Sequence, residues 1–222
     1  MKFLLSTAYF GPLQYYSKLE MADEILLEKY EHFPKQTYRN RCVIYGANGS
    51  QTLTVPITKG DSLKIYTKDV CIDYSMNWQN NHLKAIESAY GCSPFYLYYI
   101  DEILPLLQKK HVFLYDLNLE VTTSICHILG IKIHLKETQE YLKIVPQEYH
   151  DFRDSIHPKP RMSAVDNSFT APVYRQVFEP KLGFIHNLSI IDLIFNEGPE
   201  AIQLLRKSNR YKRPPLTRRP QP

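Results

Sequence analysis

The densest group of chemistry-bearing residues lies near the C-terminus. Ser189, Asp192 and Asn196 stand three and four positions apart in the segment 188–196, so they form one polar stripe on an otherwise apolar helix. Such a helix is expected to be buried, and a buried carboxylate must find hydrogen-bond partners. Two interpretations stay open: Asn187 or Ser189 caps the helix while Asp192 bonds nearby backbone, or the stripe faces a wet pocket.

A second candidate is His82, within a predicted helix over residues 77–90. Trp78, His82 and Ile86 share one face of that helix, which places an imidazole on an apolar stripe beside the only tryptophan. A general base in a cleft has these features. A core histidine whose ring bonds a backbone carbonyl has them too.

Basic and amide side chains precede the first predicted hairpin. Arg39 and Arg41 lie on one side of an extended chain and Asn40 on the other. Two guanidinium groups on one face suit a bidentate grip on phosphate or carboxylate. The same pair on an edge strand would serve solubility.

Asp116 and Asn118 precede a predicted helix over residues 118–129. Side chains of this kind hold a metal or a sugar hydroxyl, and they also cap helices. The four cysteines are 29, 21 and 34 residues apart, without the paired spacing of zinc or redox sites. No metal site is therefore expected, the cysteines indicate a reducing compartment, and no Gly-rich phosphate loop or nucleophile elbow identifies a cofactor.

The first half of the chain predicts a parallel strand pair and a hairpin that would position these residues. Residues 2–7 and 25–27 are apolar strands separated by a helix over 13–21. Two alternating segments, 41–45 and 52–57, flank the turn dipeptide Asn48-Gly49. Residues 65–73 are predicted to add a further strand.

The second half has helical periodicity over residues 77–90, 94–108 and 118–129. A strand over 131–135, an irregular Pro-rich loop over 146–172 and a strand over 173–178 follow. Helices over 188–196 and 199–205 complete the prediction. The fold class is α/β, with a mixed sheet, a β-hairpin and flanking helices in a single domain over residues 1–206.

Charge is unevenly distributed along the chain. Residues 206–222 hold seven of the 27 basic side chains and no acidic one, so acidic groups outnumber basic ones elsewhere. A nucleic-acid partner is disfavoured because recognition needs a basic folded surface, and the Pro-rich segment 207–222 is predicted to be a disordered tail. The N-terminal apolar run is too short for a secretory signal, and no segment is long enough to span a membrane, so a cytoplasmic location is expected.

Several segments together resemble the WbqC-like protein family. They include Asn40-Arg41, Trp78 with His82, Leu117-Asn118, Tyr174-Arg175-Gln176, and the terminal run that carries Ser189, Asp192, Asn196 and Gly198. The resemblance extends over about residues 3–205, and its terminal block keeps the family spacing.

The resemblance implies a role in O-antigen or other surface-polysaccharide biosynthesis, with acyl or aminoacyl transfer, such as glycine transfer to a sugar amine. Many members carry a His-Gln-Pro triplet after the first strand, where this chain has Ser6, Thr7 and Ala8. Many also carry a glycine-containing loop before the final strand, whereas residues 146–172 contain no glycine.

Two hypotheses follow, and both involve a small-molecule ligand. In the first, a transferase uses His82 as the base and Asp192 as the second catalytic group, which orients the sugar. The substrate-binding candidates are Arg39, Asn40, Arg41, Trp78, Asn118, Gln176, Ser189 and Asn196. In the second, a non-catalytic scaffold binds a sugar or nucleotide and docks a partner through its basic tail.

Overall fold

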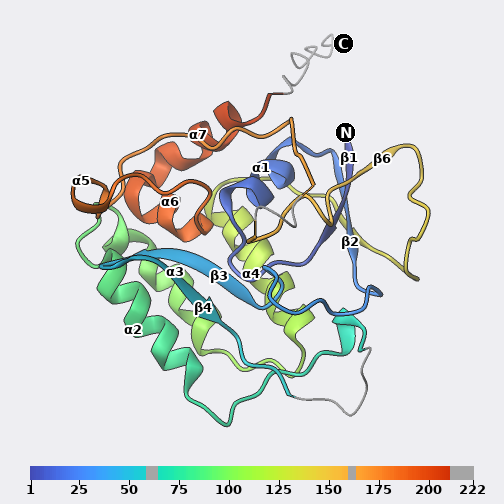
Figure 1. The fold of residues 1–222 in the computed structure, drawn as a ribbon, viewed down its shortest axis with the longest axis horizontal. Coiled ribbons are helices and arrows are strands. Elements are labelled where there is room, and N and C mark those ends of the chain that lie inside the picture. Colours follow the sequence, from blue (N-terminus) through green and yellow to red (C-terminus); the bar gives the residue numbers. More distant parts are fainter. Residues whose placement is uncertain (59–64, 160–163, 211–222) are drawn as a thin grey trace, which may run out of the picture.

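A parallel four-stranded sheet forms the scaffold (Figure 1). The computed structural model describes residues 1–58, 65–159 and 164–210. β1 (Lys2–Ser6) lies between β2 (Glu24–Glu28) and β6 (Tyr149–Asp151), and β5 (Leu135–Glu137) pairs with β2 on its other side. Because every pairing is parallel, the carboxyl ends of all four strands meet at one edge.

The strand, helix, strand unit at the N-terminus is confirmed. α1 (Leu13–Met21) connects β1 and β2, whose registers pair Phe3 with Ile25 and Leu5 with Leu27. Side chains of both strands are buried, as expected of a parallel sheet covered on its two faces. Every residue of α1 is buried as well, so this helix is enclosed by other parts of the chain.

The hairpin is also confirmed, and it forms a separate two-stranded sheet. β3 (Arg41–Gly46) pairs antiparallel with β4 (Gly49–Thr54), and Gly49 adopts a φ of +107° that suits glycine. The fold class is therefore the predicted mixture of parallel sheet, hairpin and flanking helices.

Helices pack around the hairpin and the parallel sheet. In Figure 1 the hairpin crosses between α2 and α6, and β3 contacts both helices. The helical elements are α2 (Trp78–Tyr90), α3 (Tyr96–Gln108), α4 (Leu114–Ile128), α5 (Glu179–Leu182), α6 (Ile190–Glu197), α7 (Ala201–Ser208), and the short 3₁₀ turns Thr67–Asp69 and Gly198–Glu200.

Several predicted boundaries differ from the structure. α4 begins four residues before the predicted start, so Asp116 and Asn118 lie inside the helix instead of capping it. The predicted strand over 131–135 is displaced to β5, and β6 lies inside the segment predicted as an irregular loop. Both strands have three residues, which is too few for an alternating pattern of apolar and polar residues to be recognised in the sequence.

Two predicted strands are absent from the described residues. Within 65–73 the chain forms a 3₁₀ turn and single bridges to three different segments, so no ladder develops. Over 173–178 the side chain of Gln176 replaces a backbone partner: its Nε2 donates to the Ile185 carbonyl at 2.8 Å, and its Oε1 accepts from the Ile185 amide at 2.9 Å. α7 also reaches Ser208, two residues into the predicted tail, whose residues 211–222 lie outside the described part.

Gly198 provides a test of the junction between α6 and α7. Its φ is +51°, and a Cβ there would lie 2.5 Å from the ring of Phe95. We expect Gly198→Ala to lower the free energy of unfolding by about 3–5 kcal/mol, from backbone strain plus overpacking. Gly130→Ala is the control, because Gly130 has a φ of +66° with nothing within 4 Å, and it should cost only about 1–2 kcal/mol. Equal losses in urea denaturation would contradict the packing argument.

Candidate functional site

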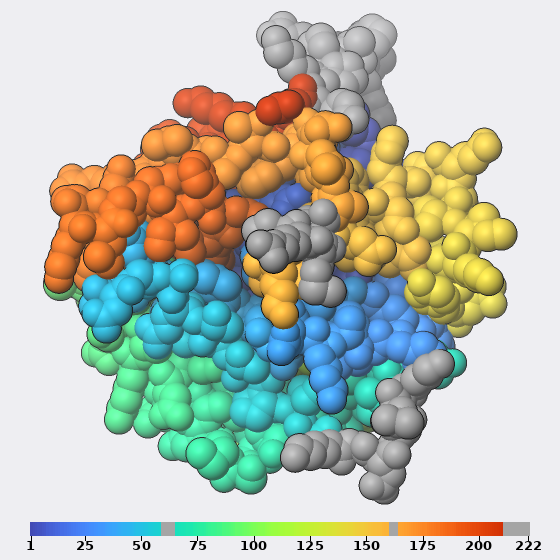
Figure 2. Space-filling view, in the orientation of Figure 1, coloured from blue at the N-terminus to red at the C-terminus, as the bar shows by residue number. Residues whose placement is uncertain are grey.

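A cavity of about 540 Å³ lies at the carboxyl edge of the parallel sheet. Ligands of open α/β sheets bind at this edge, where the strand order changes direction. The cavity wall comes from the segments that follow β2, β5 and β6, and in Figure 2 the blue segment that follows β2 borders the yellow segment on the visible face. We call this the outer cavity, and its lining residues are Tyr30, Glu31, His32, Pro34, Lys35, Thr37, Arg39, Tyr66, Tyr141, Arg153, Asp154 and His157.

Arg39 forms the floor between this cavity and the sheet. It is 5% exposed, and its Nε and Nη2 each donate to one carboxylate oxygen of Glu31 at 2.6 Å. Nη2 also donates to Ser6 Oγ at 2.5 Å. The bidentate geometry joins the segment before the hairpin to the ends of β1 and β2.

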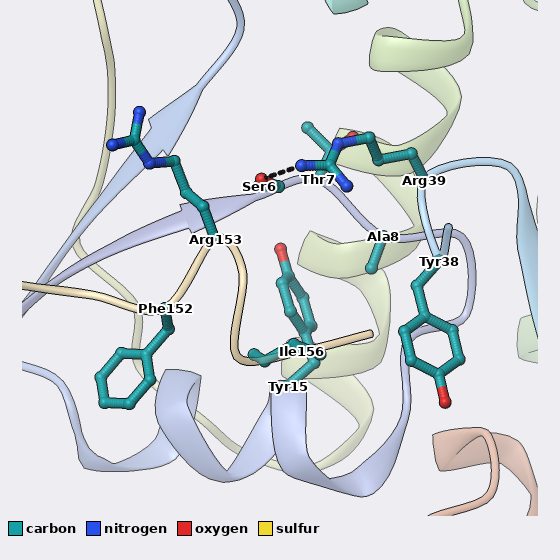
Figure 3. A pocket seen from close by; sticks show the side chains of 9 residues that line it. All are labelled: Ser6, Thr7, Ala8, Tyr15, Tyr38, Arg39, Phe152, Arg153 and Ile156. Carbon is teal, nitrogen blue, oxygen red and sulfur yellow. Dashed lines mark hydrogen bonds between the residues drawn. The ribbon is translucent and has the colours of Figure 1, made fainter. Parts of the chain in front are cut away.

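A smaller pocket adjoins the outer cavity and shares Arg39 and Arg153 with it. It encloses about 10 Å³, which is room for one water-sized group. Ser6, Thr7 and Ala8, which directly follow the apolar core of β1, line this inner pocket. Its remaining lining residues are Tyr15, Tyr38, Arg39, Phe152, Arg153 and Ile156 (Figure 3).

Aromatic groups form two walls of the outer cavity. The His32 ring stacks on Tyr66 with centroids 5.0 Å apart and planes 8° from parallel, and Tyr30 meets Tyr66 edge-on. On the other wall, the Arg153 guanidinium lies 5.2 Å from the Tyr141 ring centroid. Flat apolar faces beside cations suit a ligand with a planar or ring part and an anionic part.

The charges at the cavity divide into paired and unpaired groups. Arg153 is bound to Asp151 at 2.7 Å and to the buried Glu28 at 3.1 Å. Lys35 is exposed and has no ion pair among the described residues. Burial lowers the pKa of His157, whose Nδ1 accepts from the Lys159 amide at 3.0 Å, so its Nε2 carries the proton and is a donor.

Among the residues expected to bind substrate before the hairpin, only Arg39 lines the cavity. Asn40 donates from Nδ2 to the Val55 carbonyl at 3.1 Å, beside β4. Arg41 begins β3, and its Nε is buried without a hydrogen-bond partner among the described residues. Asn118 is fully buried on α4 and donates to Thr7 Oγ1 at 2.9 Å and to the Arg39 carbonyl at 2.7 Å. Asn118 thus does not line the cavity, but its hydrogen bonds hold Thr7 and Arg39 in place.

His82 lies in the core beside the hairpin. Its Nδ1 accepts from the Tyr9 hydroxyl at 2.9 Å, and its Nε2 donates to the Thr54 carbonyl at 3.2 Å. Trp78 packs against it, with ring centroids 5.1 Å apart. Burial lowers the pKa of His82 to about 4, so the imidazole is neutral at pH 7. Both nitrogens have internal partners, and neither cavity includes the residue.

Asp192 is fully buried on α6, and its Oδ2 accepts from the Tyr174 hydroxyl at 2.6 Å. Burial raises the pKa of this carboxyl to about 6. Hydrogen bonds from the hydroxyls of Tyr174 and Tyr90 and from the amide of Gln176 lower the pKa and so oppose the effect of burial. The Tyr90 end of α2 meets this group, whereas His82 is eight residues earlier, about 12 Å along the helix axis. The structure therefore does not bring His82 and Asp192 together.

Ser189 and Asn196 also have internal partners. Ser189 Oγ donates to the Phe10 carbonyl at 2.7 Å, and Asn196 Nδ2 donates to the Asp192 carbonyl at 2.7 Å. Asn187 accepts the Gln14 amide at 2.9 Å, so it caps α1 and not its own helix. The catalytic roles expected for His82 and Asp192 stay predictions, and the outer cavity does not depend on them.

Sequence reasoning missed most of the cavity wall. Glu31, His32, Arg153 and His157 lie in irregular segments, where no periodicity marks a face. One signal was available: Glu31 and His32 closely follow an apolar strand of a predicted parallel pair, and the carboxyl end of such a strand is where ligands bind. Arg153 follows β6, which was not predicted.

The profile of the WbqC-like protein family matches residues 7–154 and 162–204. The chain belongs to the WbqC-like protein family. It is also similar to the uncharacterized protein Rv1507c of Mycobacterium tuberculosis (strain H37Rv), at 27% identity over 213 residues that cover 86% of this chain and 91% of that protein. No solved structure matches the chain.

Ser6, Thr7 and Ala8, at the positions where the resemblance implies a His-Gln-Pro triplet, all line the inner pocket. Across residues 1–58, 65–159 and 164–210, no group of three His, Cys, Asp or Glu side chains is placed to hold a metal ion. Within the same residues, every helix is too short or too polar to cross a bilayer.

The opposite pKa shifts of His82 and Asp192 predict opposite pH effects on stability. Asp192 has a pKa raised to about 6, so between about pH 4 and pH 6 the folded protein holds a proton that the unfolded chain lacks, and acidification stabilises the fold. His82 has a pKa lowered to about 4, so its stabilising effect is present above about pH 6.5 and is lost as the pH falls toward 4.

We therefore expect Asp192→Asn to lose stability more steeply than the wild type between pH 6 and pH 4, and His82→Gln to lose it less steeply. Each difference should be on the order of 2–3 kcal/mol across the window. Urea denaturation at pH 4, 5, 6 and 7 measures these slopes. Parallel profiles for all three proteins would show that neither group has its shifted pKa.

Proposed function

We propose that this WbqC-like protein is an acyl or aminoacyl transferase of surface-polysaccharide biosynthesis, and that the outer cavity binds its sugar substrate. The carrying observation is the cavity itself, about 540 Å³ at the carboxyl edge of the parallel strands. Its size falls in the range of small-molecule sites. Its position is the one that open α/β sheets use for ligands.

The lining suits a phosphorylated sugar such as a sugar nucleotide. The Tyr66 and Tyr141 rings offer flat faces for a sugar or base. Lys35 is an unpaired cation at the rim, and the Nε2 proton of His157 is a further donor toward phosphate or hydroxyl oxygens. Arg39 and Arg153 are paired with carboxylates. They therefore form part of the cavity wall but add little net positive charge to it.

The transfer needs a group that accepts a proton from the sugar amine. His32 lines the cavity, has no hydrogen-bond partner among the described residues, and is held by its stack on Tyr66. Histidine is the side chain best suited to this task at neutral pH. In the proposed step the amine nitrogen bonds to the acyl carbon of an activated ester or thioester, the leaving group departs with its electron pair, and His32 takes the proton.

Lys35→Ala tests the binding half of this proposal. A thermal-shift screen against nucleotide sugars, aminoacyl donors and acyl-coenzyme A should yield a ligand that raises Tm by mass action, by about 5–10 °C at 100 times its Kd. Lys35→Ala should weaken that ligand about 5–10-fold, because one charge-assisted contact is lost. The matched control is Lys84→Ala, an exposed lysine on α2. Equal weakening in both variants, or no ligand in the screen, would contradict the site.

His32→Gln tests the chemical half. With the identified ligand and an amine acceptor, its kcat should fall at least about 100-fold, because a general base contributes at least that much. His134→Gln serves as the control, since His134 precedes β5 at the opposite edge of the sheet. Unchanged turnover in His32→Gln would remove His32 from the mechanism.

A non-catalytic binding protein is the second candidate. The observation in its favour is that Ser6, Thr7 and Ala8 line the inner pocket where many relatives carry a histidine. A ligand that binds in the Lys35-dependent manner, without transfer to any amine acceptor, would support this alternative.

A further inference from the structure

The inner pocket brings the polar side chains of Ser6, Tyr15 and Arg39 around a space for one water-sized group. In Figure 3 the Tyr15 hydroxyl rises from α1 toward Ser6, and the Arg39 guanidinium lies on the opposite side of the same space. The Arg153 guanidinium and the Tyr38 hydroxyl both point away. The free space of about 10 Å³ admits one water-sized group, or one atom of a ligand that fills the outer cavity.

Tyr15 lines the inner pocket with a hydroxyl that has no internal partner in the described part of the chain. Its side chain is 1% exposed, and its hydroxyl has no hydrogen-bond partner among the described residues. The Thr122 hydroxyl lies nearby and opposes the effect of burial on the pKa of Tyr15. Burial raises the pKa of Tyr15, so the hydroxyl keeps its proton and is a donor. A buried hydroxyl without a partner lowers the stability of the fold. A hydroxyl that donates to a bound ligand is expected to lack a partner when the ligand is absent.

Arg39 supplies a second donor on the same space. Its Nε and Nη2 are used by Glu31 and Ser6, while Nη1 has no hydrogen-bond partner among the described residues. The Glu31 carboxylate holds the guanidinium plane, so Nη1 is oriented before a ligand arrives. Two preoriented donors around a one-atom space have the form of an oxyanion hole.

We infer that the inner pocket receives the carbonyl oxygen of the acyl group, with the Tyr15 hydroxyl and Arg39 as its hydrogen-bond donors. This inference rests on the proposed transferase function and adds a residue to it. When the amine attacks the acyl carbon, the carbonyl electron pair moves to that oxygen. Collapse of the tetrahedral intermediate restores the carbonyl and expels the leaving group. Donors at the oxygen stabilise the charged stage more than the substrate.

The test compares two adjacent tyrosines. Tyr15→Phe and Tyr16→Phe each remove one buried hydroxyl without a partner among the described residues, both beside Thr122, but Tyr16 does not line the inner pocket. Neither variant should lower Tm, because neither removes an internal hydrogen bond. This outcome is a folding control for both proteins.

The first measurement uses formamide, whose carbonyl oxygen has acyl chemistry, and formate as a charged probe. Crystals of the full chain soaked in either probe should show its oxygen at hydrogen-bond distance from Tyr15 Oη. The same density is expected in Tyr16→Phe and should be absent in Tyr15→Phe. A pocket that excludes both probes, or that binds them equally in Tyr15→Phe, overturns the assignment. Formate bound without formamide would mean an adventitious ion only, and would overturn it as well.

The second measurement follows turnover with the substrate pair from the screen. Tyr15→Phe should lower kcat about 100–1,000-fold with KM within about threefold, since the hydroxyl acts mainly at the charged stage. Tyr16→Phe should match the wild type. If formamide binds at Tyr15 while no sugar ligand binds the outer cavity, the proposed function fails and the carbonyl site stands. If sugar ligands bind and turn over but Tyr15→Phe is fully active, the inference fails alone.

Discussion

The buried guanidinium of Arg39 is the constraint around which the site is organised. A cation at 5% exposure requires a paired carboxylate, because an isolated buried charge costs several kcal/mol. Glu31 supplies that carboxylate from the segment that follows β2, and Ser6 at the end of β1 completes the group. The Arg39 carbonyl meanwhile accepts from Asn118 of α4. One residue thereby fixes the two central strands, the approach to the hairpin and a core helix relative to one another.

A second buried ion pair attaches the segment around Asp166 to α1. Lys18 on α1 is fully buried, with Nζ 2.7 Å from Asp166 and 2.6 Å from the Ser168 hydroxyl. Burial lowers the pKa of Lys18, and the contact with Asp166 opposes that shift. Gln14, one turn earlier on α1, also donates to Asp166 at 2.9 Å. The segment around Asp166, which has no regular structure, is thus attached to a helix that packs against α7. These side-chain contacts add to the single backbone bridge between Phe169 and Asn209.

The sequence predicted the elements whose signal is local. Apolar runs identified β1 and β2, Asn48-Gly49 identified the hairpin, and helical periodicity identified α1, α2 and α3. Elements that depend on distant partners were missed: β6 has three residues and exists because it pairs with β1. Gln176 was named a binding residue because it belongs to a run that resembles the family, although its amide pairs with the backbone of Ile185. Polar residue type alone does not distinguish a group that binds a ligand from one that completes the core.

A group that binds a ligand is distinguished from one that completes the core by whether its hydrogen-bonding atoms already have partners in the folded structure. His82 and Ser189 have chemistry suited to a site, and internal partners use it. Asp192 and Asn118 also have internal partners, but the Oδ1 atom of each is buried without one among the described residues. Tyr15 and Tyr16 are adjacent, identical in type and equally buried, so no pattern in the sequence separates them. Of the two, only Tyr15 lines the inner pocket, which shares Arg39 and Arg153 with the outer cavity. An unsatisfied donor that lines an enclosed polar space is the stronger indication of a ligand, because an atom bound in that space can supply the missing hydrogen-bond partner.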